Sequence, residues 1–216
     1  MERVEGLAPW LRGVLHEAAF YASVPVGVAL SLSARGGTPR ATAAVFAASV
    51  AACFGASALY HRGRWSPARR RWLRRLDHAG VYSLIAGTYT PVGMLVLHGA
   101  WRASVLATVW GGAALAIFLR VVWIGAPEWL SAVIGIALGW VGVVVFAQLV
   151  RRLGLEPSLL LLAGGLCYTA GAVVYARRRP DPLPGVFGFH ELFHALTIAA
   201  VALHYAAIAF FVLPRS

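Results

Sequence analysis

The chain has 216 residues, of which 60% are hydrophobic and only 12% are charged, and its formal net charge is +11. Its mean hydropathy is +0.73. This composition excludes a soluble globular domain, because water would not keep so much apolar surface in solution. The two cysteines, Cys53 and Cys167, fall inside apolar stretches and indicate no disulfide framework. We therefore expect an integral membrane protein.

Membrane-spanning segments can be located by their length. A hydrocarbon core about 30 Å thick is crossed by about 20 mostly apolar residues, at roughly 1.5 Å rise per residue. Seven stretches without Arg, Asp or Glu approach that length: Ala18 to Ala34, Ala41 to Tyr60, Ala79 to Leu97, Ala103 to Leu119, Trp129 to Val150, Ser158 to Ala176 and Leu192 to Leu213. The links between them are short. The sequence predicts an all-α integral membrane protein, a single seven-helix transmembrane domain over residues 1–216.

The distribution of arginine predicts the orientation. All 19 basic residues are arginines, and the predicted helices place 13 on one face of the membrane and 6 on the other. Seven of the 13 fall between Arg62 and Arg75, which is expected to be the loop after the second helix. The other members of the larger group are Arg3, Arg12, Arg120, Arg177, Arg178 and Arg179. Because cytoplasmic loops carry the excess of basic residues, we expect a cytoplasmic N-terminus and an external C-terminus.

The positive charge could also indicate a nucleic acid as partner. The arginines, however, are expected in short loops beside the hydrocarbon core, where they can contact anionic lipid headgroups. We therefore expect membrane lipids as partners and no nucleic acid.

A few polar and ionisable residues lie near the ends of these segments. Burying a charge near the bilayer centre costs roughly 2.5 to 3.5 kcal/mol, so such residues are informative. Ser57 and His61 are four residues apart and share a helical face, as do His190 and His194 at the start of the seventh helix. Asp77 is expected to open the third helix. The topology places all three motifs at the cytoplasmic face, where they can meet.

This group of residues suggests a metal site. Two histidines spaced i, i+4 can bind one ion together, and a third from a neighbouring helix completes the protein side of a catalytic zinc site. The fourth position is then left for water, which Asp77 could deprotonate and Ser57 could orient. Zinc suits three imidazoles, although iron and nickel also accept imidazole.

The string HELFH, His190 to His194, also fits the H-E-x-x-H pattern of metalloproteases, with Glu191 as general base. Such proteases commonly take a third ligand downstream of the pair. No Asp or Glu follows Glu191 in the sequence, and His204 lies about 15 Å further along the helix. A protease would lack its usual third ligand, and Glu191 is more simply a residue near the cytoplasmic end of the helix.

Two runs of the sequence resemble the hemolysin III family: SALYHRGRWSPARRRWLRRLDHAGVYSLIAGTYTP, from Ser57 to Pro91, and GGLCYTAGAVVYARRRPDPLPGVFGFHELFH, from Gly164 to His194. This family is a bacterial branch of the progestin and adiponectin receptor (PAQR) superfamily, which is related to the alkaline ceramidases. The resemblance implies a seven-helix protein of the bacterial cytoplasmic (inner) membrane. It also implies one zinc ion bound by three histidines, with a serine and an aspartate beside the bound water. The matching positions are His61, His190, His194, Ser57 and Asp77.

The N-terminus departs from the family pattern. Many hemolysin III sequences have an Asn soon after an acidic start, where this chain reads RGVLHEAAFY, so the roles of His16 and Glu17 stay open. His78 follows Asp77 and points about 100° away from it on a helix, which favours a hydrogen bond over metal ligation. His204 is expected to bond to a neighbouring helix.

Three functions remain open. The first is a zinc-dependent, ceramidase-like hydrolase of amide-linked lipids, which an acid and a hydroxyl beside the metal at the membrane face would favour. The second is a non-enzymatic protein of membrane-lipid homeostasis or sensing, in which zinc is structural. The third is a cytolytic (haemolytic, pore-forming) protein, as the family name suggests. No helix shows a repeated polar stripe suited to lining a channel, so the third has the least physical support.

Overall fold

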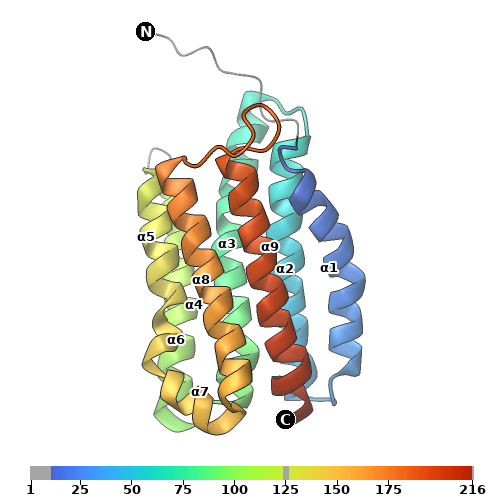
Figure 1. Cartoon of the computed structure of the whole chain (residues 1–216), viewed down its shortest axis with the longest axis vertical. Helices are drawn as coiled ribbons and strands as arrows, with labels where there is room; N and C mark the ends of the chain where they lie inside the picture. The colour runs from blue at the N-terminus through green and yellow to red at the C-terminus, as the bar shows by residue number, and fades with distance from the viewer. Residues whose placement is uncertain (1–10, 124–126, 216) are drawn as a thin grey trace.

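A computed structural model of the chain describes residues 11–123 and 127–215. Figure 1 shows a bundle of long helices that run along one common direction. The helices are α1 Val14–Ser33, α2 Thr38–Arg62, α3 Pro67–Leu95, α4 Gly99–Val122, α5 Glu128–Gly139, α6 Val141–Val144, α7 Phe146–Leu153, α8 Leu155–Arg177 and α9 Phe189–Ala207. A π-helical turn, η1 Ile208–Val212, and a 3-10 turn, η2 Leu213–Arg215, extend α9.

Several of these helices can cross a membrane. Within the described ranges, five are long and apolar enough, namely α1, α2, α4, α8 and α9 with its extension. The stretch formed by α5 and α6 passes the same test together with α7, as one span bent by 54°. The chain is therefore an all-helical membrane protein with five or six candidate spans.

The predicted span from Ala79 to Leu97 falls on α3, which is not one of these candidates. Ser83, Thr88 and Tyr89 interrupt its apolar residues. α3 packs against α2, α4, α5 and η1, and much of its length is buried inside the bundle. Because the buried residues of α3 are concentrated between Gly80 and Gly93, polar side chains in this part of the helix need not be compatible with lipid.

α3 also begins earlier than predicted, so the expected loop from Arg62 to Arg75 is mostly helix. Only residues 63–66 link α2 to α3. The Ser66 hydroxyl accepts a hydrogen bond from a backbone N–H three residues further on, at 3.4 Å, and Pro67 occupies the first turn. Both features favour a helix start. The expectation that Asp77 opens the helix is therefore wrong, because α3 continues through the arginines at which an apolar window ends.

The segment predicted as one helix from Trp129 to Val150 is broken into α5, α6 and α7. The first break lies at Trp140, between Gly139 and Gly142. The Tyr89 hydroxyl of α3 donates to the Gly139 carbonyl at 2.6 Å and accepts from the Gly142 N–H at 2.7 Å. Backbone groups freed at membrane depth need such partners, since lipid offers none. Tyr89 therefore stabilises the break.

One end of the bundle brings several helix termini together. α2 ends there, and α3 and α9 begin there, at the upper end of the view in Figure 1. α1 also begins at this end, which we call the upper end. Residues distant in the sequence can therefore meet at one level of the bundle.

α2 and α3 approach closely at Gly80. A Cβ atom at this position would lie 2.9 Å from the Cα atom of Cys53, a backbone atom that has no freedom to rotate away. Small residues at helix contacts allow such close packing in membranes.

We expect Gly80→Ala to lower the melting temperature of the detergent-purified protein by several degrees, because overpacking a close contact costs about 1 to 3 kcal/mol. The measurement is the loss of monodisperse protein after heating. Gly111→Ala is the matched control, since a Cβ atom at position 111 meets nothing within 4 Å. Equal melting temperatures for Gly80→Ala and the wild type would contradict this account of the contact.

Candidate metal centre

Three histidines meet at the upper end of the bundle. His61 comes from the last turn of α2, and His190 and His194 come from the first turns of α9. One ring nitrogen from each lies within 4.8 Å of the others, and the Nε2 atoms of His61 and His190 are 3.1 Å apart. Two nitrogens that each lie 2.0–2.1 Å from a tetrahedral zinc ion are about 3.3 Å apart. The cluster could therefore hold a metal ion.

The local sequence explains how the three rings converge. On α9 the i, i+4 spacing of His190 and His194 puts both rings on one helical face. His61 occupies the matching level because α2 ends where α9 begins. The structure thus brings together the three histidines that the sequence placed at one membrane face, and their role as metal ligands stays a prediction.

Asp77 and Ser57 lie beside this cluster. The Oδ2 atom of Asp77 is 3.7 Å from the Nε2 atom of His61. Ser57 is 2% exposed, and no group in the described part of the chain hydrogen-bonds its Oγ atom. The same holds for the Nδ1 atom of His194. A buried polar atom without a partner costs about 1 to 3 kcal/mol, so this arrangement fits a site whose polar atoms act on a metal ion, water or substrate.

α1 adds a fourth imidazole. His16 is 2% exposed, and its ring stacks on that of His194 with centroids 3.7 Å apart and planes 13° from parallel. Gly13, just before α1, lets the chain pass close to the end of α2: its φ is +78°, and a Cβ atom there would lie 2.6 Å from the Cβ atom of His61. The sequence left the role of His16 open, and the structure places its ring against the cluster.

Glu17 has a different position. Its Oε2 atom accepts a hydrogen bond from the Nε atom of Arg62 at 2.8 Å, and both side chains are partly exposed. Glu17 therefore joins α1 to the end of α2 and contributes no group to the cluster.

Glu191 is fully buried and is held by two hydrogen bonds. Its Oε1 atom accepts from the Nε atom of Arg12 at 3.2 Å, and its Oε2 atom accepts from the Gly188 N–H at 2.9 Å. Both carboxylate oxygens are thus engaged in fixing the start of α9, which argues against the general base of an H-E-x-x-H protease. This role of Arg12 could not be predicted from the sequence, because the pair is separated by 179 positions and no local motif marks it.

An elongated cavity of about 210 Å³ begins at the cluster. His190, His194, Asp77 and Ser57 all belong to its wall. On α3 the lining continues from Asp77 to Val92, which at 1.5 Å per residue is about 22 Å. The cavity therefore joins a polar end, at the histidines, to a long interior passage.

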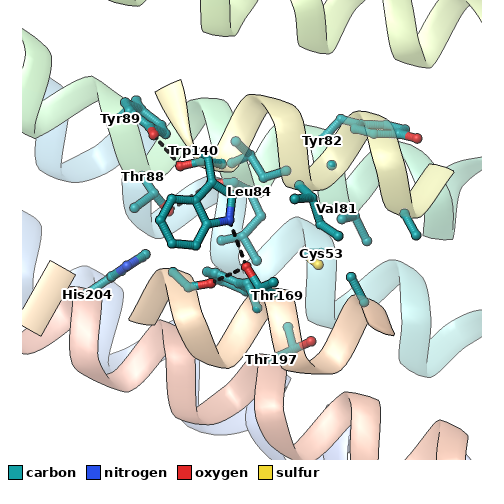
Figure 2. Close-up of a pocket in the computed structure, with 18 of the residues that line it drawn as sticks. Cys53, Val81, Tyr82, Leu84, Thr88, Tyr89, Trp140, Thr169, Thr197 and His204 are labelled. Carbon is teal, nitrogen blue, oxygen red and sulfur yellow. Dashed lines mark hydrogen bonds between the residues drawn. The ribbon is translucent and has the colours of Figure 1, made fainter. Parts of the chain in front are cut away.

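The interior passage is mainly apolar. Figure 2 shows Val81, Leu84 and Cys53 among the side chains around it. The indole Nε1 atom of Trp140 donates to Thr169 at 3.0 Å, which joins the break after α5 to α8 (Figure 2). Deeper in the bundle, the Nε2 atom of His204 donates to the Leu161 carbonyl of α8 at 3.0 Å, so the expected bond of His204 to a neighbouring helix is confirmed.

Comparison with known proteins adds relatives of two kinds. Hemolysin-3 of Bacillus cereus is 32% identical over 141 residues, which cover 65% of this chain and 62% of that protein. A hemolysin-3 homolog of Bacillus subtilis (strain 168) is 26% identical over 139 residues, or 64% of this chain and 62% of the relative. The chain thus matches less than two thirds of the length of these two relatives.

A plant protein matches over a longer region. Heptahelical transmembrane protein ADIPOR2 of Oryza sativa subsp. japonica is 30% identical over 190 residues, which cover 80% of this chain and 82% of that protein. The family model described as haemolysin-III related matches residues 6–205. The resemblance found in the sequence is therefore confirmed, and this multi-pass membrane protein belongs to the haemolysin-III related family.

Proposed function

We propose that the protein is a zinc-dependent hydrolase of amide-linked lipids, built as a single seven-helix domain of the bacterial cytoplasmic membrane. One observation carries the proposal: Asp77 and Ser57 lie beside the cluster of three imidazoles, and both side chains belong to the wall of an elongated apolar cavity. A lipid hydrolase needs a place for an acyl chain and a base next to the scissile bond. This cavity offers both.

The candidate ligands have defined roles. His61, His190 and His194 would hold the zinc ion, which, when bound, supplies Lewis-acid polarisation of a carbonyl and lowers the pKa of water. The aspartate and the serine are assigned to the reaction itself, and not to holding the ion.

The passage suits the acyl chain. A chain of a bilayer lipid spans about half of a hydrocarbon core of roughly 30 Å, and the lining of the cavity runs for about 22 Å along α3. An acyl chain in this passage places its amide carbonyl near the polar end, beside Asp77 and Ser57. The headgroup then lies at the upper end of the bundle.

Asp77 acts as the general base. Its carboxylate takes a proton from the attacking water, whose oxygen bonds to the acyl carbon. The C–N bond breaks, and the proton passes to the leaving amine, which gives a fatty acid and a free amine. The Ser57 hydroxyl orients the water or the carbonyl.

A second candidate is a lipid-sensing protein in which the metal is structural. The observation that favours it is the fourth imidazole, since His16 stacks on His194 and covers one side of the cluster. A cytolytic function is suggested by the name of the family and by the names of the two Bacillus relatives, and the relatives' names describe the relatives.

Replacing any one of His61, His190 and His194 with Ala should lower bound zinc well below one ion per chain, because it removes one of three protein ligands. The measurement is elemental analysis of the purified protein. His98→Ala is the control, since His98 is exposed before the first turn of α4. Full zinc retention in His61→Ala would instead support a site built on HELFH alone.

Asp77→Asn should keep nearly normal bound zinc but lower the rate of fatty-acid release about 10²- to 10⁴-fold, because the side-chain amide of Asn cannot take a proton from water. The assay is mass spectrometry of fatty acid released from long-chain N-acyl lipids. Ser57→Ala should show a milder loss. If the wild type releases no fatty acid while Asp77→Asn still disturbs the membrane of the host cell, the sensor with structural metal is the better description.

We also propose that the upper end of the bundle faces the cytoplasm, as the arginine split of 13 to 6 predicts, with Arg3 lying outside the described residues. A reporter active only in the periplasm should be active when fused after Ser216. It should be inactive when fused after Arg64, in the link between α2 and α3. The opposite pattern would reverse the orientation.

A further inference from the structure

A second cavity, of about 330 Å³, lies at the upper end of the bundle. The end of α2, the first turns of α3 and the last turn of α4 enclose it. Its lining residues are Tyr60, Pro67, Arg70, Arg71, Arg74, Arg75, His78 and Arg120. Among these described residues five are arginines and none is acidic. The volume lies at the lower end of the range for small-ligand pockets, about 300 to 1,000 Å³.

Arg70, in the first turn of α3, stands where a helix by itself disfavours cations, whereas Arg71, Arg74 and Arg75 lie beyond that turn. The N-terminus of a helix carries partial positive charge and favours anions. The first turn of α3 nevertheless has no acidic residue. The spacing adds repulsion, because Arg70 with Arg74 and Arg71 with Arg75 form like-charged i, i+4 pairs. A bound anion would offset both effects, which is a reason for such a sequence at this position.

Aromatic rings hold two of these guanidinium groups in place. The Cζ atom of Arg70 lies 5.7 Å from the ring centroid of Tyr60, and that of Arg75 lies 4.6 Å from that of Trp72. A stacked guanidinium uses its face for the ring and keeps its N–H donors in its plane, where they can bind phosphate oxygens in pairs. Arg120, only 9% exposed, adds a positive charge from the interior side.

We propose that this arginine cavity binds one phosphate group, carried by the headgroup of an anionic membrane lipid. The lipid source follows from the position at the ends of membrane helices. Trp72, 57% exposed on the same turns of α3, is also typical of residues at the membrane interface. The arginine cavity borders the cavity at the histidine cluster, since His78 lines both, but it contains none of the three clustered histidines. The proposed phosphate site does not depend on the proposed hydrolase activity.

Calorimetric titration of the full chain in neutral detergent tests the proposal, with short-chain phosphatidic acid, short-chain phosphatidylcholine and inorganic phosphate as probes. We expect one saturable site for phosphatidic acid. The variant Arg70→Gln/Arg71→Gln/Arg75→Gln should weaken it about tenfold or more, because it removes three charge-assisted donors. The control Arg64→Gln/Arg69→Gln/Arg177→Gln removes the same charge from residues outside the cavity and should keep the affinity.

The outcomes separate the cavity from general surface attraction. Equal weakening in the two triple variants, equal binding of phosphatidylcholine, or no saturable binding of any probe would overturn the proposal. Inorganic phosphate bound as tightly as phosphatidic acid, and lost in the cavity variant alone, would support the phosphate site and overturn its lipid source. If the triple variant is not monodisperse, Arg71→Gln compared with Arg69→Gln decides the same question.

Discussion

A polar side chain buried among membrane helices has to find its partner on another part of the protein, because lipid supplies none. This constraint fixes the relative positions of α1 and α9. Glu191 of α9 has no exposed surface, and Arg12, just before α1, supplies its counter-charge. Removing one member of a buried pair leaves the other uncompensated, which is strongly destabilising. The stacking of His16 on His194 depends on the same approach of α1 to α9.

Much of the candidate site could be predicted from residue spacing. Histidines at i, i+4 share a helical face, and helices that begin or end at one membrane face bring few other residues to that level. The spacing therefore predicts that His61, His190 and His194 are neighbours, and the structure brings one ring nitrogen from each within 4.8 Å of the others. His78 makes a hydrogen bond, as expected, since its Nδ1 atom donates to the Arg74 carbonyl of the same helix at 2.6 Å.

Other features could not be predicted in this way. Hydropathy measures compatibility with lipid and not helicity, so the start of α3 was expected at Asp77, where the apolar window ends. The helix begins earlier, at the cap formed by Ser66 and Pro67. Hydropathy also gave no sign of the break at Trp140, which depends on a tyrosine from another helix. The pairing of Arg12 with Glu191 depends on how the two ends of the chain pack, and a single sequence carries no local signal for that.

The histidine cluster joins helices that are synthesised at widely separated times, because α2 and α9 are far apart along the chain. α1 and α2, which carry His16 and His61, leave the ribosome well before α9, which carries His190 and His194. Until α9 is inserted, the membrane holds only one of the three clustered histidines, and Arg12 has no Glu191 to pair with. The cluster is thus completed only when α9 is inserted. A nascent chain stopped before α9 lacks the cluster however well its earlier helices have inserted.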